Sequence, residues 1–124
     1  MREILFRGKN SNGEWEYGVP VFSGLNNELA FMKQMHSYDH QVDPETIGQY
    51  TGLTDKNGKK IFEGDIVVTN IKGNNTVCKV AWADNVAQFQ LWQTNTIPHT
   101  STVLNLGNYD CEIIGNIYDN PELL

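Results

Sequence analysis

Alternation between apolar and polar residues is the feature of this sequence that most restricts its fold. In the segment EWEYGVPVF, Trp15, Tyr17, Val19 and Val21 alternate with polar or small neighbours. Successive side chains of a β-strand point to opposite faces of a sheet, so this pattern predicts a half-buried strand whose apolar face packs on the core. The same period of two recurs in at least five segments. Several short strands separated by turns are typical of an all-β barrel or sandwich.

The clearest turn signal lies in the central stretch IGQYTGLTDKNGKKIFEGDIV, residues 47–67. Asn57-Gly58 between two strand-like runs predicts a hairpin with a type I′ turn, which requires positive φ at Gly58. We expect Gly64 to relieve a bulge or bend in the returning strand. We also expect Asp65 to accept hydrogen bonds from backbone N–H groups where that strand begins.

Glu63 and Asp65 also have the spacing of a catalytic pair. Two carboxylates two residues apart on a strand share one face, as general acid–base catalysis requires. No nucleophile or pocket accompanies them in the sequence, so we interpret both as structural and assign no catalytic residue. The glycines nearby lack the Gly-Lys-Ser/Thr ending of a phosphate-binding loop.

Residues 28–36, ELAFMKQMH, fit two patterns. Leu29, Met32 and His36 would line one side of a helix, whereas Leu29, Phe31 and Met35 would line one face of a strand. We favour a strand because the surrounding pattern is β, and the helix stays open.

His36 and His40 are four residues apart, which would place both imidazoles on one face of a helix. A small metal-dependent enzyme that uses this region is therefore the alternative function. A zinc site needs a third protein ligand, for which His99 or an unassigned carboxylate is available. The residues between the histidines do not match a metalloprotease motif, so we interpret them as exposed loop residues. We assign no metal and no cofactor.

The cysteines and the N-terminus indicate the compartment. Cys78 and Cys111 lie in strand-like runs, and we interpret them as buried thiols, with a redox pair left open if those strands are neighbours. The first residues, MREILFRGKN, lack the apolar region of a secretory signal, and no apolar run approaches the roughly 20 residues that cross a bilayer. We expect a cytoplasmic protein that does not contact membranes.

Charge is distributed unevenly along the 124 residues, whose net charge is −6. All nine Lys and Arg lie at or before Lys79, where ten Asp and Glu accompany them, and the remaining residues carry five acids and no base. Nonspecific nucleic-acid binding depends on cations that meet phosphates, so we expect none, although Lys56, Lys59 and Lys60 form a local basic tip. The acidic C-terminal part could suit a basic partner or imitate DNA, and we interpret its carboxylates as solubilising.

Three blocks of the chain resemble one known family. REILFRGK with GEWEYG, PETIGQYTGLTDKNGKKIFEGDIV and IIGNIYDNPELL occur in this order and are similar to the YopX family of phage and prophage proteins. The resemblance covers nearly the whole chain and implies a single YopX-like domain, residues 1–124. It implies N-terminal β-hairpin elements in residues 1–50, an SH3-type small barrel in residues 51–124, and a bacterial host cytoplasm. The resemblance implies no enzymatic reaction for this chain and no functional residues.

We therefore expect a non-enzymatic protein-binding module, an accessory phage protein that recognises a host or phage protein. Trp15, Trp92 and Tyr109 would be natural anchors because aromatic residues dominate interface energetics, although burial in the core is the more common fate of such residues. The alternatives are the metal-dependent enzyme and an acidic DNA-mimic-like inhibitor. A homo-oligomer stays open.

Overall fold

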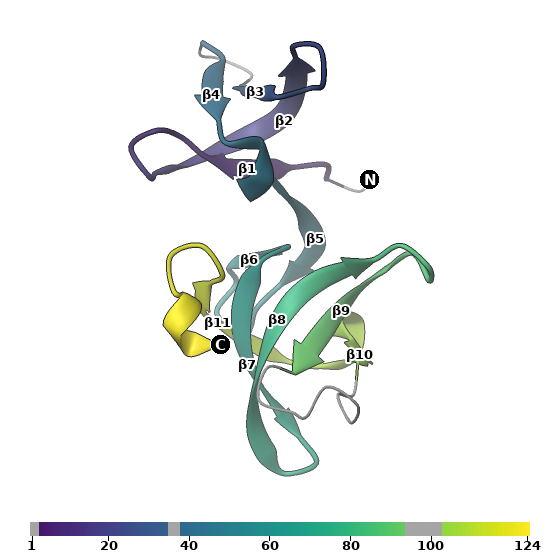
Figure 1. Ribbon diagram of the computed structural model, residues 1–124. Helices are drawn as coiled ribbons and strands as arrows, with labels where there is room; N and C mark the ends of the chain where they lie inside the picture. Colours follow the sequence, from purple (N-terminus) through teal and green to yellow (C-terminus); the bar gives the residue numbers. More distant parts are fainter. Residues whose placement is uncertain (1–2, 35–37, 94–102) are drawn as a thin grey trace. The chain divides into compact units, whose positions relative to one another are not determined.

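The structure is a computed structural model that describes residues 3–34, 38–93 and 103–124 (Figure 1). These residues form two antiparallel sheets with three short 3₁₀ helices and no α-helix, so the predicted all-β class is confirmed. The chain divides into two compact units, Met1–Gly52 and Leu53–Leu124, and the boundary lies in strand β5 (Gly48–Thr54). In the part of the chain that the structure describes, no helix is long and apolar enough to span a membrane.

The first unit is an antiparallel meander. Its sheet has the strand order β4-β3-β2-β1-β5-β6, in which the last strand lies beyond the unit boundary. Ala30, Met32 and Val42 are buried on one face, and Phe6 and Ile47 pack against them. The elements are β1 (Phe6–Lys9), β2 (Trp15–Ser23), β3 (Leu29–Lys33), β4 (His40–Val42) and the 3₁₀ helix η1 (Pro44–Thr46).

Strand β3 confirms the strand that we favoured for the ambiguous segment. Leu29 and Phe31 lie on one face as expected, but Ala30 and Met32, on the other face, are the fully buried residues. The buried face therefore carries a small residue, Ala30, and a flexible one, Met32. Met35 and His36 lie outside the described residues.

The burial that the alternation predicts for β2 is wrong. Tyr17, Val19 and Val21 share one face and are 45%, 49% and 45% exposed. The opposite face carries Gly18 and Pro20 and is directed towards the core. A Cβ atom at Gly18 would overlap the carbonyl oxygen of Lys33 on β3, so the core side of β2 requires a residue without a side chain at this position.

The second unit contains the larger core. Strands β7 to β10 form a meander, and β11 returns to pair with β7, which gives the order β10-β9-β8-β7-β11 (Figure 1). The elements are β6 (Lys60–Phe62), β7 (Asp65–Ile71), β8 (Asn74–Ala83), β9 (Gln88–Gln93), β10 (Val103–Asn105), η2 (Leu106–Asn108), β11 (Cys111–Asn116) and η3 (Pro121–Leu123). The buried cluster is Ile61, Val67, Cys78, Val80, Leu91, Leu106 and Cys111.

The hairpin between β5 and β6 has the predicted position but not the predicted turn type. Gly58 has φ of 83°, and its N–H donates to the Asp55 carbonyl over 3.0 Å. Asn57 does not adopt positive φ, so type I′ was wrong. A turn followed by a left-handed glycine is the usual form of slightly longer hairpin loops.

Gly64 and Asp65 shape the next turn. Gly64, with φ of 87°, lies between β6 and β7 and bends the chain there, as predicted. Asp65 is 2% exposed, and its Oδ2 accepts from the Phe62 N–H over 2.8 Å, which confirms its predicted role. In the described residues no closed barrel is found, so the SH3-type barrel stays a prediction.

Candidate binding surfaces

His40 is exposed, as interpreted, but it lies on strand β4 and not in a loop, and it contacts a carboxylate. Its Nδ1 is 3.1 Å from Oε1 of Glu16. His36 and His99, the other residues considered for a zinc site, lie outside the described residues. Within the described ranges, no group of three or more His, Cys, Asp or Glu is arranged to hold a metal ion.

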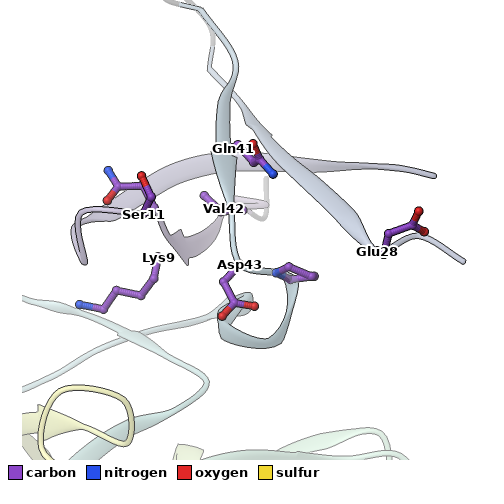
Figure 2. Close-up of a pocket in the computed structure, with 8 residues that line it drawn as sticks. Lys9, Ser11, Glu28, Gln41, Val42 and Asp43 are labelled. Atoms are coloured by element: carbon purple, nitrogen blue, oxygen red, sulfur yellow. The ribbon is translucent and has the colours of Figure 1, made fainter.

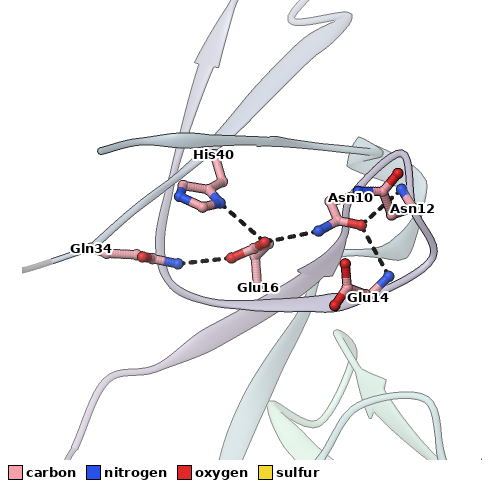
Figure 3. Close-up of polar contacts among 6 residues, drawn as sticks. All are labelled: Asn10, Asn12, Glu14, Glu16, Gln34 and His40. Carbon is pink, nitrogen blue, oxygen red and sulfur yellow. Dashed lines mark hydrogen bonds and ion pairs between the residues drawn. The ribbon is translucent and has the colours of Figure 1, made fainter. Parts of the chain in front are cut away.

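Glu16 is the centre of a polar cluster (Figure 3). The Asn10 amide donates to Oε1 over 2.8 Å, and the Gln34 amide donates to Oε2 over 2.9 Å. The pKa of Glu16 lies below its usual value, chiefly because of the Asn10 hydrogen bond; desolvation opposes this shift, and His40 and Gln34 reinforce it. The cluster joins the β1–β2 loop to β3 and β4, and we interpret it as structural.

A hollow of about 430 Å³ lies in the same unit (Figure 2). Lys9 and Ser11 line one side of it in this view, and Glu28 lies on the other. Its polar groups are already used: Lys9 Nζ donates to the Gly13 carbonyl over 2.8 Å, and Asp43 Oδ1 accepts from the Glu45 N–H over 3.0 Å. Because these groups hold loops and the start of η1, the hollow is a weak candidate for a ligand site.

The exposed face of the first sheet is a stronger candidate. We call it the outer face and define it as Trp15, Tyr17, Val19 and Val21 of β2 with Leu29 and Phe31 of β3. The strand register places Val21 opposite Phe31, and Ser23 opposite Leu29. Residues directly opposite each other in an antiparallel pair project to the same side of the sheet. The outer face is therefore one continuous apolar surface over two strands.

Positive charge accompanies the outer face. The register places Arg7 opposite Tyr17, Lys9 opposite Trp15 and Lys33 opposite Val19. The Arg7 guanidinium carbon lies 4.1 Å from the centre of the Trp15 ring, and Lys9 Nζ lies 4.6 Å from it. No Asp or Glu occupies an outer-face position of β1, β2 or β3, all of which the structure describes. Because Arg7 is buried, Lys9 and Lys33 supply the accessible positive charge of this face.

The carboxylates of the second unit are largely committed to structure. Asp55 is buried, and its Oδ1 accepts from the Asn57 and Lys59 N–H groups, each over 2.9 Å. Its Oδ2 accepts from the Ile113 N–H over 3.1 Å. Desolvation acts to raise the pKa of Asp55, but the three backbone hydrogen bonds, with Lys59 nearby, prevail and lower it. No local sequence pattern predicts this role because Ile113 is 58 residues away.

The basic tip is partly neutralised within the fold. Lys56 Nζ lies 3.1 Å from Oε2 of Glu112, and both side chains are about half exposed. This ion pair uses one of the three lysines of the basic tip, so the tip is weaker support for a phosphate site. It also uses one of the acids after Lys79, so those acids are weaker support for a DNA-mimicking surface.

The two cysteines are buried free thiols, as interpreted from the sequence. Strand β7 lies between β8, which carries Cys78, and β11, which carries Cys111, so the condition for a redox pair is not met. Burial raises the pKa of Cys78 to about 11, with a smaller contribution from Cys111. The pKa of Cys111 is raised as well, mainly by burial.

A second candidate surface lies on the β8–β9 hairpin, and we call it the aromatic hollow. The strand register pairs Trp82 with Phe89 and Trp92 with Lys79, so the two tryptophans lie on opposite faces of the sheet. The hollow has a volume of about 560 Å³, and its lining includes Trp82, Asp84, Val86, Gln90 and Trp92. Trp82 is 40% exposed and Trp92 is 38% exposed, so the expected burial of Trp92 is wrong. Trp15 and Tyr109 are half-buried.

Comparisons with known proteins agree with the resemblance noted in the sequence. A family model described as "YopX protein" matches residues 6–124. The crystal structure of protein EF1440 from Enterococcus faecalis is similar, with 26% identity, a TM-score of 0.61 and coverage of 100% of this chain and 99% of that chain. No curated protein matches the chain.

Proposed function

The chain belongs to the YopX protein family, and we propose that it is a non-enzymatic accessory protein of a phage or prophage that binds a host or phage protein. The observation that carries this proposal is the outer face. An apolar surface that continues across two strands, instead of being covered by the core, is typical of an interaction site.

The composition of the outer face fits a protein partner. Trp15, Tyr17 and Phe31 are residue types enriched in interfaces, and the aliphatic Val19 and Val21 between them favour an apolar contact. Lys9 and Lys33 would complement acidic residues at the edge of the partner's surface and would speed association. Arg7, which is buried, instead packs on the Trp15 ring.

Single-stranded nucleic acid is the second candidate for the outer face. Aromatic side chains on a sheet can stack on nucleobases, while Lys and Arg side chains between them neutralise the phosphates. The net charge of −6 and the aliphatic residues of this face favour the protein partner.

The SH3-type character of the second unit is part of the same proposal. It is supported by the β7–β10 meander and by the return of β11 to β7, a short antiparallel arrangement around one core. If the protein is an accessory protein of a phage or prophage, it acts in the cytoplasm of the bacterial host.

The test is affinity capture from host cells that carry the phage, with identification of both bound proteins and bound nucleic acid. The captured partner is then titrated against the unmodified protein, Val19→Glu and Ile114→Glu. Ile114 is a matched control, since it lies on a strand of the second unit and is 39% exposed. We expect Val19→Glu to weaken binding about tenfold or more and Ile114→Glu to change it less than about twofold.

Three results would contradict the proposal. They are the absence of any reproducible protein partner, equal binding by both variants, and recovery of nucleic acid whose binding is lost in Val19→Glu. Metal analysis of protein purified without a polyhistidine tag tests the alternative enzyme, which would require stoichiometric metal.

A further inference from the structure

Two hairpin turns of this chain contain the same reactive dipeptide. Asn is followed by Gly at two positions, Asn12-Gly13 between β1 and β2 and Asn57-Gly58 between β5 and β6. All four residues are exposed, and the two glycines have φ of 78° and 83°. The two turns therefore present the same chemical groups to solvent in nearly the same backbone conformation at the glycine.

An Asn-Gly peptide can modify itself in water. The backbone nitrogen of the glycine loses its proton and attacks Cγ of the asparagine, because glycine has no Cβ to obstruct this approach. An N–C bond forms, the side-chain amide leaves as ammonia, and water then opens the succinimide ring to give aspartate or isoaspartate. Both products carry an additional negative charge, and isoaspartate also lengthens the backbone by a methylene group.

Both turns hold the attacking nitrogen in a hydrogen bond. The Gly13 N–H donates to the Asn10 carbonyl and the Gly58 N–H donates to the Asp55 carbonyl, each over 3.0 Å. This bond must break before the nitrogen can approach Cγ, so the reaction requires local opening of the turn. The rate at each site therefore depends on what else holds its turn closed.

The Asn57-Gly58 turn is hydrogen-bonded to a third strand. The buried carboxylate of Asp55 accepts from the Ile113 N–H of β11 over 3.1 Å, in addition to its bonds within the turn. The Lys56 N–H donates to the Cys111 carbonyl, also on β11, over 2.9 Å. Opening of this turn would disturb its attachment to β11.

The Asn12-Gly13 turn is held by bonds within its own hairpin (Figure 3). Asn10 Oδ1 accepts from the N–H groups of Asn12 and Glu14 over 2.9 and 3.0 Å, and Lys9 Nζ donates to the Gly13 carbonyl over 2.8 Å. These hydrogen bonds are exposed to solvent, and the acceptor is a neutral amide where the other turn has a buried carboxylate. They can break without disturbing a third strand.

We infer that Asn12 is a modification site, at which the protein deamidates spontaneously, whereas the fold protects Asn57. The reaction adds a carboxylate one residue before the carbonyl that accepts from Lys9. Lys9 is one of the two lysines that supply the accessible positive charge of the outer face, so the modification would reduce that charge. The inference does not depend on the proposed function, because the reaction requires only this chain and water.

The test is incubation of the full-length protein at mildly alkaline pH, with samples taken over time. Each sample is digested at acidic pH, where deamidation is slow, and both sites are followed by mass spectrometry. An isoaspartyl methyltransferase, which labels isoaspartate, detects the product independently. Synthetic peptides of residues 7–17 and 52–62 give the rate of each site without the fold. The rate in the peptide divided by the rate in the protein measures the protection of that site.

We expect the protection of Asn57 to exceed that of Asn12 by about fivefold or more, because one net hydrogen bond changes an opening equilibrium by about that factor. Asn12→Gln should abolish the product at this position, since glutamine would have to form a larger ring. Asp55→Asn should reduce the protection of Asn57 and leave that of Asn12 unchanged.

Equal protection of the two sites, or greater protection of Asn12, would overturn the inference. The absence of product at Asn12 after its peptide has reacted completely would overturn it as well. Circular dichroism checks that Asp55→Asn is folded, and if that variant does not fold, the ratio of protections in the parent protein decides.

Discussion

The two units use their apolar residues in opposite ways. The buried hydrophobic cluster of the second unit has seven residues, whereas that of the first unit has three, and the first unit leaves the outer face exposed. Each buried aliphatic side chain contributes about 1.5–3 kcal/mol to folding. The second unit therefore has the larger reserve of stability, and the first unit has the larger apolar surface available for a partner.

This difference teaches that stability and recognition are divided between the units. Substitutions in the second core should change unfolding, and substitutions on the outer face should change binding with little effect on unfolding. The first prediction below compares the two units, and the next two, with smaller expected effects, test what stabilises the second unit.

Leu91→Ala should have the largest effect. Leu91 is fully buried in the core of the second unit, and truncation of such a residue costs about 2–5 kcal/mol. Met32→Ala, its counterpart in the first unit, should have a cost in the same range of about 2–5 kcal/mol. Hydrogen exchange followed residue by residue should show that each variant loses protection in its own unit. Equal loss of protection in both units would show that they unfold as one.

Asp55→Asn should destabilise the second unit by about 1–3 kcal/mol at neutral pH, because the amide nitrogen cannot accept the backbone N–H groups that the carboxylate accepts. The pKa of Asp55 is lowered in the folded state, so its contribution is complete above the unfolded pKa of about 3.9. It is lost as pH falls through the folded pKa.

Urea unfolding measured across a pH series checks this. The difference between Asp55→Asn and the parent protein should shrink in acid. A difference that stays constant down to the lowest pH would mean that the Asp55 charge does not contribute.

Gly58→Val should cost on the order of 1 kcal/mol or more, because a β-branched residue is strained at φ of 83°. Gly58→Asn is the matched control, since Asn tolerates left-handed φ. Thermal unfolding of the second unit should rank the parent first, Asn second and Val last. A Val variant as stable as the parent protein would refute the assigned backbone conformation.

Local patterns in the sequence predicted the local structure. The period of two predicted the strands, Asn57-Gly58 predicted the hairpin, and the Gly64-Asp65 pair predicted the bend and its hydrogen bond. These features depend on residues a few positions apart. The turn type was wrong because a glycine at positive φ is common to several hairpin loops.

The burial of β2 could not be predicted because alternation identifies two faces and does not say which one is covered. Gly18 decides this through its close approach to Lys33 of β3, a contact that depends on strand pairing. The role of Asp55 was out of reach for the same reason, since Ile113 is brought to it by the fold. The candidate surfaces depend on these tertiary contacts. The outer face is the face of β2 that we expected to be buried, and the aromatic hollow is formed by the pairing of β8 with β9.

The burial of both thiols makes the protein suitable for site-directed labelling without removal of its own cysteines. With a pKa of about 11, Cys78 is ionised in about one molecule in ten thousand at pH 7, and the thiolate is the form that reacts with maleimides. Cys111 is buried in the same core. A cysteine introduced at Val19 or at Asp84 would therefore react selectively, and a fluorophore or spin label placed there would report on each surface separately in the otherwise unmodified protein.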